Sequence, residues 1–211
     1  MAINLIEVLK NNPVIPVAVF GSTDHALKVS ELLLENRMSV LEVTLRTDAA
    51  FDCIERVSRT FPEMTVGAGS VLSSDSLSKA RDKGARFGVA PCLDPEVMER
   101  AASLCIPFIP GISTPSELNQ ALKKCSIIKL FPASHLGGVE YIKALAAPFK
   151  MRELYLVPTG GVNDKNYREY LKADRVIACG MTYLVESALM DKGDFETIRG
   201  RIQTVAAGLH S

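Results

Sequence analysis

The stretch VIPVAVFGSTDHALKVSELLLENRMSVLEVTL, residues 14–45, contains the pattern that decides the fold class. Its two ends, residues 14–20 and 39–45, are short apolar runs of the kind typical of buried strands. Between them, residues 23–37 carry apolar side chains at helical spacing: Ala26, Val29, Leu33 and Leu34. A strand, a helix and a strand in this order predict two parallel strands joined by a helical crossover.

The same alternation continues to the end of the chain. Further strand-like runs, bounded by Gly, Pro, Ser or Asn, lie at residues 64–69, 86–91, 106–110, 126–131, 154–158 and 175–180. Eight strand–helix units in 211 residues predict one α/β domain over residues 1–211, a (β/α)8 TIM barrel. Residues 3–10 would form an extra N-terminal helix that closes the bottom of the barrel. A doubly wound open sheet is the alternative, although its usual glycine-rich fingerprint is not found in the turn at residues 20–25.

Two helix boundaries can be read from single residues. Gly84 follows a helical segment and is typical of a helix C-terminus. Thr114 precedes Pro115, which suits a first-turn position, and Glu117 lies three residues after Thr114. We therefore expect one helix to end near residue 84 and another to begin near residue 115.

Composition and charge exclude several classes of partner. The chain is 47% hydrophobic and 23% charged, which suits a globular domain with a sizeable core. Lys plus Arg equals Asp plus Glu, at 24 each, so there is no basic excess for a nucleic acid or a membrane surface. We expect neither as a partner.

The cysteines and the N-terminus predict a cytoplasmic protein. The five cysteines form no CxxC pair and are odd in number, as free thiols of a reducing compartment would be. The first 13 residues lack the features of a signal peptide, and no apolar run approaches the ~20 residues of a membrane span. The three histidines, His25, His135 and His210, form no metal-binding motif, so we expect no metal and no cofactor.

Polar residues gather at the end of the second predicted strand. Glu42, Thr44 and Arg46 alternate with Val43 and Leu45, so the three polar side chains share one face. In a barrel with helices outside, the polar face points inward, at the end where catalytic residues lie. A structural ion pair between Glu42 and Arg46 is the alternative.

Lys129 interrupts the apolar run at residues 126–131. Lysine is rarely buried unless it is paired or functional, which leaves three explanations. Its stem could carry the amine to solvent, or the amine could pair with Glu42 as a structural bridge. Alternatively Lys129 is a nucleophile, because desolvation favours the neutral amine that attacks a ketone.

Glu42 and Lys129 would line the open end of the barrel, at the carboxyl ends of the strands. A site lined by Glu and Lys suits Schiff-base chemistry better than metal-assisted chemistry. An unprotonated amine attacks a ketone, and a nearby acid–base group moves protons during dehydration and cleavage. Glu42 is the carboxylate candidate for that second role.

Small residues follow the last two predicted strands. Thr159, Gly160 and Gly161 suit a loop that holds a phosphate with backbone N–H groups, and Gly180 and Thr182 repeat the pattern. Turn glycines without a ligand are the alternative. The glycine-rich residues 66–71 would admit a small substrate or relieve crowding.

Five motifs together resemble one enzyme family. VLEVTLRT, VGAGSVL, IPGISTPSEL, IKLFPAS and PTGGVN occur in this order and resemble the class I aldolases for 2-keto-3-deoxy-6-phosphogluconate (KDPG), which also cleave 4-hydroxy-2-oxoglutarate (KHG). The resemblance runs from about residue 13 to residue 185. It implies a metal-free homotrimer of (β/α)8 barrels that yields pyruvate and glyceraldehyde 3-phosphate, or glyoxylate, in the Entner–Doudoroff route of carbohydrate metabolism.

The resemblance also implies residue roles. Lys129 matches the Schiff-base lysine, Glu42 the acid–base glutamate, and Arg46 the arginine on the carboxylate side of pyruvate. On the same basis Gly160, Gly161 and Thr182 match the phosphate side. These assignments come from matching motifs and not from spacing.

The chain departs from the family pattern at several positions. Ser70 stands where Thr is usual and keeps the hydroxyl expected to bind pyruvate. Ala90 and Cys92 flank Pro91, which is retained as a substrate-side residue. Met181 and Thr182 stand where Gly and Ser are common, and the bulkier Met181 would narrow the phosphate site or change its affinity. Thr159 implies a gluconate-type enzyme, whereas galactonate-type relatives often have Val.

Two other functions compete with the aldolase. A phosphate-binding barrel isomerase would explain the glycine turns but not an interior Lys129. A non-catalytic binding module would have little reason to keep Lys129, Glu42 and Arg46 together.

Overall fold

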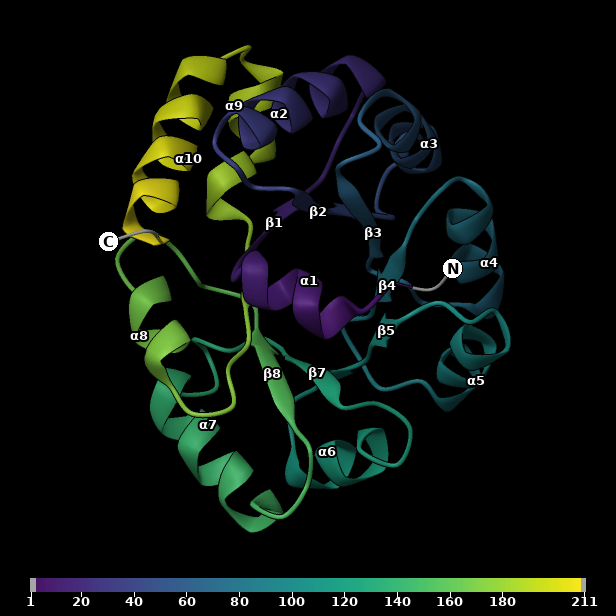
Figure 1. Ribbon diagram of the computed structural model, residues 1–211, viewed down its shortest axis with the longest axis vertical. Helices are drawn as coiled ribbons and strands as arrows, with labels where there is room; N and C mark the ends of the chain where they lie inside the picture. Colours follow the sequence, from purple (N-terminus) through teal and green to yellow (C-terminus); the bar gives the residue numbers. More distant parts are fainter. Residues whose placement is uncertain (1–2, 210–211) are drawn as a thin grey trace.

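The computed structural model describes residues 3–209, and His210 lies outside this range. Short strands alternate with helices along the chain (Figure 1). The strands are β1 (Val14–Ala18), β2 (Val40–Thr44), β3 (Thr65–Gly69), β4 (Phe87–Val89), β5 (Phe108–Ile109), β6 (Gly111–Ile112), β7 (Ile127–Leu130), β8 (Tyr155–Pro158) and β9 (Cys179–Met181). The helices are α1 (Leu5–Asn11), α2 (Thr23–Glu35), α3 (Ala50–Thr60), α4 (Ser74–Asp82), α5 (Pro95–Ser103), α6 (Pro115–Ala121), α7 (Gly138–Ala146), α8 (Tyr167–Lys172), α9 (Ser187–Asp191) and α10 (Phe195–Leu209), with 3-10 turns η1 (Ala147–Phe149) and η2 (Tyr183–Val185).

The strands pair in parallel and form a curled sheet ringed by helices (Figure 1). One sheet has the order β5-β4-β3-β2-β1-β9 and the other has the order β6-β7-β8. Isolated bridges between Leu156 and Val176, and between Thr159 and Gly180, link β8 to the segment that contains β9. The predicted α/β fold with parallel strands is confirmed.

One predicted strand is divided. The sequence predicts a single strand at residues 106–110, whereas β5 ends at Ile109 and β6 begins at Gly111. Pro110 lies between them and has no N–H to donate, so the hydrogen-bond ladder is interrupted there. The pairing partner changes at the same point, since β5 pairs with β4 and β6 pairs with β7.

The two faces of the sheet bury different clusters. Leu41 and Val43 face the surrounding helices and belong to the larger cluster. Val40, Ile127 and their neighbours belong to a smaller cluster inside the ring. Period-two alternation is therefore kept, with the outer face wholly apolar.

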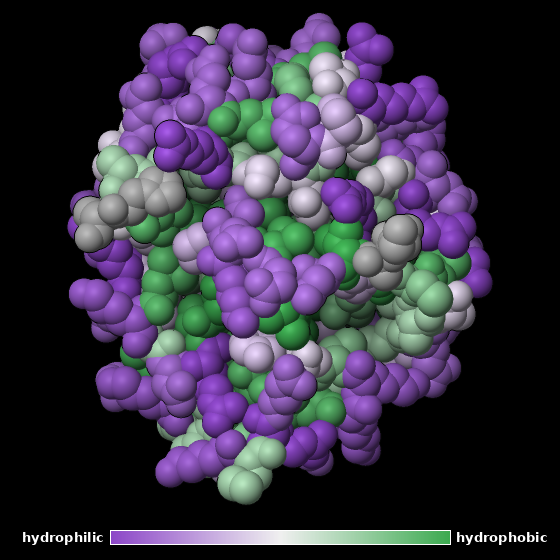
Figure 2. Space-filling view, in the orientation of Figure 1, coloured by the Kyte–Doolittle hydropathy of each residue, from purple (hydrophilic) through white to green (hydrophobic). Residues whose placement is uncertain are grey.

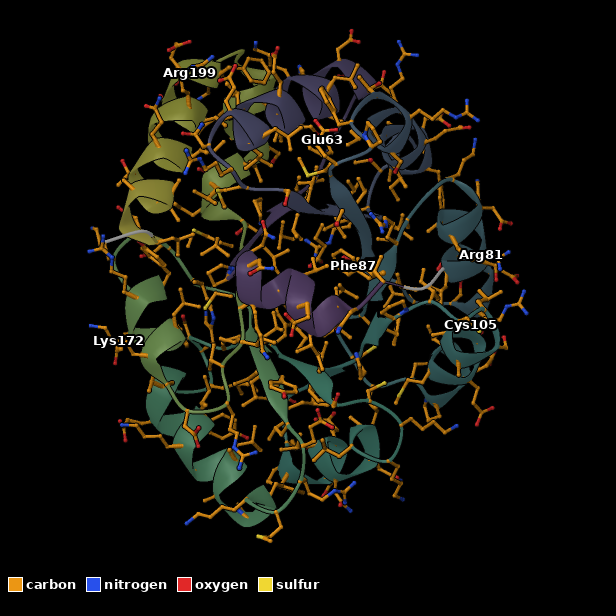
Figure 3. All side chains as sticks on the ribbon, viewed as in Figure 1. Glu63, Arg81, Phe87, Cys105, Lys172 and Arg199 are labelled. Atoms are coloured by element: carbon orange, nitrogen blue, oxygen red, sulfur yellow. The ribbon has the colours of Figure 1, made fainter. Side chains whose placement is uncertain are left out.

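Helix α1 lies across one end of this interior (Figure 1). Its buried residues Leu5 and Leu9 pack in the inner cluster together with Phe87, which is labelled beside α1 in Figure 3. Burying each leucine contributes roughly 1.5–3 kcal/mol. The helix expected at residues 3–10 is thus observed as Leu5–Asn11, over the amino ends of the strands.

Both predicted helix boundaries are confirmed. Helix α6 starts with a complete capping box between Thr114 and Glu117, with Pro115 in its first turn. Gly84, at φ +102°, follows the end of α4. Within residues 3–209, none of the helices combines the length and the apolar character that crossing a membrane requires.

Candidate active site

The predicted site residues lie at the carboxyl ends of the strands, opposite α1. Glu42 and Lys129 lie on β2 and β7, and Gly180 lies on β9. The other seven follow strand ends: Arg46, Ser70, Pro91, Thr159, Gly160, Gly161 and Thr182. Because the strands are parallel, their carboxyl ends meet at one edge of the curled sheet.

Lys129 and Glu42 form a buried pair. The Lys129 Nζ lies 3.5 Å from the Glu42 Oε1, and their side chains are 6% and 3% exposed. The explanation in which Lys129 reaches solvent is therefore wrong. Glu42 also pairs with Lys129 and not with Arg46, so the alternative of a Glu42–Arg46 ion pair is wrong as well.

The geometry of this pair is poor for a structural bridge. Buried charges repay their desolvation only with close, well-directed hydrogen bonds. Among the described residues, the Glu42 Oε1 is buried and has no hydrogen-bond partner. In a half-buried pair elsewhere in the protein, by contrast, Lys83 donates to Glu55 at 2.5 Å. The buried amine and carboxylate attract each other but keep bonding capacity for another molecule.

Glycines in β3 make room for Glu42. In register, Glu42 lies opposite Gly67, and Thr44 lies opposite Gly69. A Cβ at Gly69 would collide with the Glu42 carboxylate, and a Cβ at Gly67 would collide with the Phe87 ring. These glycines therefore relieve crowding, which was one of the two roles that the sequence left open.

Arg46 and Ser70 form a polar pair beside the mouth. The Arg46 Nε donates to the Ser70 Oγ at 2.9 Å. Ser70 has φ +55°, a left-handed conformation that costs a residue with a Cβ of order 1–3 kcal/mol. The strained backbone sets the position from which the Ser70 hydroxyl meets the guanidinium.

Pro91 lies close to β7 because Gly111, which pairs with Lys129, leaves room for the Pro91 backbone. Gly111 lies opposite Lys129 in register, and the Lys129 N–H donates to Pro110 O. A Cβ at Gly111 would collide with the backbone of Pro91. Nothing in the structure explains the Cys92 side chain that follows.

The residues predicted to bind phosphate also gather. Thr159 is 4% exposed and bridges to Gly180, where a Cβ would collide with the Thr159 Oγ1. Gly160 and Gly161 have φ of +94° and +78°, and Thr182 is exposed just before η2. Left-handed residues of this kind form turns whose N–H groups bind anions.

The expectation that Met181 narrows the site is wrong. Met181 is fully buried in the outer cluster, with Leu184 and Val185. Because side chains alternate along β9, Gly180 faces the interior and Met181 faces the helices.

Three groups near the site have no role in the sequence prediction. The Phe131 ring centroid lies 5.7 Å from the Lys129 Nζ, and shared parity with Lys129 is the signal that could have found it. The Ser134 Oγ and the Tyr170 hydroxyl lie 3.0 Å apart. No sequence signal connects these two distant positions.

Other nucleophiles are less suitable than Lys129. Burial raises the pKa of the Cys53 and Cys125 thiols to about 11, so both remain protonated near neutral pH.

Among residues 3–209, no three His, Cys, Asp or Glu side chains are placed to hold a metal ion.

Hollows in the described surface lie around α1, at the other end of the sheet (Figure 2). One, of about 430 Å³, is lined by Lys10, Tyr155 and Arg175 among others. The hollows around α1 contain none of the predicted site residues. Among residues 3–209, the α1 end offers no buried nucleophile beside an acid–base group, so the buried Lys129–Glu42 pair makes the opposite end the candidate site.

Comparison with known proteins decides the family. The family model described as "Aldolase: KDPG and KHG aldolase" matches residues 5–201. The chain belongs to this family. It is therefore an aldolase, a lyase, and the sequence resemblance is confirmed. Family membership favours this function over the isomerase and the binding module.

Relatives of known name cover nearly the whole chain. The KHG/KDPG aldolase of Escherichia coli K12 is 38% identical over 196 residues, 91% of this chain and 90% of that protein. The 2-dehydro-3-deoxy-phosphogluconate aldolase of Dickeya dadantii is 35% identical over 206 residues, 96% of this chain and 94% of that protein.

Solved structures of aldolases have the same fold as this chain. The KDPG aldolase of Legionella pneumophila, with pyruvate captured as a covalent carbinolamine, has a TM-score of 0.91 and 33% identity, over 96% of this chain and 98% of that chain. The 2-keto-3-deoxy-6-phosphogluconate aldolase of Zymomonas mobilis with 3-phosphoglycerate has a TM-score of 0.89 and 28% identity, over 97% and 95% of the two chains.

Proposed function

We propose that this aldolase cleaves 2-keto-3-deoxy-6-phosphogluconate to pyruvate and glyceraldehyde 3-phosphate through a Schiff base on Lys129. The observation that carries the proposal is the buried Lys129–Glu42 pair at the carboxyl ends of β7 and β2. The Legionella relative that holds pyruvate as a carbinolamine supports amine chemistry on a ketone. The relatives named for both substrates support 4-hydroxy-2-oxoglutarate as a second substrate, cleaved to pyruvate and glyoxylate.

The mechanism begins with formation of the imine. The neutral Lys129 amine attacks the C2 ketone, and proton transfer gives a carbinolamine. Glu42, which has accepted the proton of the Lys129 ammonium, gives it to the carbinolamine hydroxyl; the hydroxyl leaves as water and a protonated imine remains. Glu42 is the group within reach of Nζ that moves these protons, a contribution of typically 10²–10⁴ in rate.

Cleavage follows from the charge on the imine. Glu42 accepts the proton of the C4 hydroxyl, the C3–C4 bond breaks, and its electron pair neutralises the imine as an enamine. C4 leaves as the aldehyde. The enamine C3 then takes a proton back from Glu42, and water hydrolyses the pyruvate imine to release pyruvate and the free amine. The proton released by hydrolysis passes to Glu42 and back to Lys129, so the charged pair of the resting enzyme is regenerated.

The remaining residues hold the two ends of the substrate. Arg46, supported by the Ser70 hydroxyl, would bind the carboxylate of the pyruvyl end, and Pro91 would wall it. At the other end Gly160, Gly161, Gly180 and Thr182 would bind the phosphate. Thr159, between the two ends, would contact the sugar hydroxyls and favour the gluconate over the galactonate epimer.

The proposal extends to architecture and context. β5 and β6 would act as one interrupted strand and the β8–β9 bridges would complete a closed eight-stranded barrel capped by α1. Three such barrels would form the homotrimer, in the cytoplasm, in the Entner–Doudoroff route. Sedimentation equilibrium tests the trimer, and turnover in the presence of EDTA tests the absence of a metal requirement.

The experiment that tests the mechanism is chemical trapping. The protein is incubated with pyruvate and borohydride, and its intact mass and peptide map are measured. We expect one reduced pyruvyl adduct, on the peptide that contains Lys129. Lys79→Ala, at an exposed lysine over the Phe51 ring, is the control and keeps the adduct. A folded protein that stays unmodified would return Lys129 to a structural role.

A further inference from the structure

The loop after β7 and the turn after β8 are in direct contact. The Ala133 N–H donates to Thr159 O at 2.8 Å, and the Ser134 N–H donates to Gly160 O at 3.0 Å. A Cβ at Gly161 would lie 2.6 Å from both the Cβ and the Oγ of Ser134. The β7 loop therefore forms one wall of the glycine turn.

These contacts set the direction of the amide groups in the turn. A trans peptide group is planar, so its C=O and its N–H point in opposite directions. Since Gly160 O accepts from Ser134, the N–H of Gly161 points away from the β7 loop. Gly161 O accepts from the Asn166 Nδ2 at 2.9 Å, which fixes the next peptide group. The carbonyls of the turn are thus engaged by protein and its N–H groups face the other way.

A hydroxyl pair completes this arrangement. The Ser134 Oγ lies 3.0 Å from the hydroxyl of Tyr170, whose side chain is 3% exposed. Tyr170 belongs to α8, which follows the turn and packs beside α7 (Figure 1). The loop after β7 contacts the turn after β8, the turn leads into α8, and the Ser134–Tyr170 hydroxyl pair connects α8 back to the loop.

We propose that Ser134 and Tyr170 are positioning residues for the phosphoryl group: their hydroxyl pair holds the Gly160–Gly161 turn so that its N–H groups meet that group. The inference rests on the proposed function and names two side chains that touch no reacting atom. Because the pair acts on one end of the substrate, its loss weakens recognition of a phosphorylated substrate more than that of an unphosphorylated one.

The test compares two substrates that share the pyruvyl end. For wild type and Tyr170→Phe, kcat/KM is measured with 2-keto-3-deoxy-6-phosphogluconate and with unphosphorylated 4-hydroxy-2-oxoglutarate. We expect the ratio of the two values to fall about fivefold in Tyr170→Phe, the scale of one lost hydrogen bond, mainly through KM for the phosphorylated substrate. Ser134→Ala gives the same fall, and the double variant is no worse, because both changes remove one contact.

The matched control lies on the same helix. Tyr167 is also buried, but its hydroxyl faces Val205 O and Arg168 instead of the β7 loop. Tyr167→Phe keeps the wild-type ratio. Equal losses on both substrates in Tyr170→Phe, or an unchanged ratio with only a lower melting temperature, overturn the inference and leave the aldolase proposal intact. A wild type that cleaves neither substrate and forms no borohydride adduct with pyruvate overturns both.

Discussion

The two ends of the sheet interior differ within two residues of each strand. On β2, Val40 and Glu42 point to the same inner face, and on β7 so do Ile127 and Lys129. Val40 and Ile127 pack in the apolar cluster under α1, whereas Glu42 and Lys129 form the buried charged pair. One step along the inner face, about 6.6 Å, separates an apolar core from a buried charged pair.

The space inside the sheet shows the same contrast. At the end that holds Lys129, proposed above as the reactive end, Gly69 leaves the space that the Glu42 carboxylate occupies. At the α1 end, the inner layer is filled by ordinary apolar side chains. The comparison teaches that apolar packing fills one end of the interior, whereas the buried ion pair lies at the other. Changes at the α1 end should therefore lower the free energy of unfolding without changing turnover per folded molecule.

The largest effect is expected at the nucleophile. Lys129→Ala removes the amine that forms the Schiff base, so cleavage should fall by about 10⁴-fold or more. The buried Glu42 loses its partner, so the free energy of unfolding should also fall, by about 3–5 kcal/mol for a broken buried pair. Turnover assays and urea unfolding measure the two effects. Turnover within tenfold of wild type would contradict the assignment.

The next largest effect is expected at the acid–base group. Glu42→Gln keeps the shape of the side chain but accepts no proton, so kcat should fall by roughly 10²–10⁴-fold. The KM should change much less, because the Arg46 and glycine-turn contacts are kept. Steady-state kinetics separate the two constants, and a variant that loses only binding would make Glu42 a positioning group.

The apolar end of the sheet interior, under α1, is tested by a substitution that creates a cavity. Leu9→Ala removes a fully buried side chain from the inner cluster and should lower the free energy of unfolding by about 2–5 kcal/mol. Turnover per folded molecule should stay at the wild-type value, since Leu9 lies at the far end from Lys129. Glu7→Ala, at an exposed position on the same helix, is the control. A selective loss of kcat in Leu9→Ala would contradict the conclusion that the α1 end contributes to stability and not to turnover.

The smallest effect is expected at the α6 cap, a purely structural feature at the reactive end. Thr114→Ala should cost about 1 kcal/mol of unfolding free energy at neutral pH, without changing kcat. Burial raises the pKa of Glu117, but hydrogen bonds from the N–H and hydroxyl groups of Ser113 and Thr114 outweigh it, and the net pKa is lowered from 4.5.

The lowered pKa of Glu117 gives the cap a pH dependence. The unfolded state binds the proton more tightly, so the carboxylate stabilises the folded state above pH 4.5 and loses this effect as pH falls through the lower folded pKa. Unfolding of wild type and Glu117→Gln should differ at neutral pH and converge in acid. A difference that is constant from neutral pH into acid would show that the Glu117 charge is not the cause.

The sequence by itself determined the local pattern. Apolar runs and helical spacing predicted the elements, the capping residues predicted the start of α6, and parity predicted that Glu42 faces inward. These features depend on periodicity and backbone geometry over a few residues, which the sequence states directly. Matching motifs added the family, which the comparisons confirmed.

Only the tertiary structure decided how distant residues meet. It paired Glu42 with Lys129 at 3.5 Å, divided a predicted strand at Pro110, and turned Met181 away from the site. It also joined Ser134 to Tyr170. Each outcome depends on the register and curl of the sheet, because a contact between distant strands is set by their relative placement and not by the pattern of either strand alone.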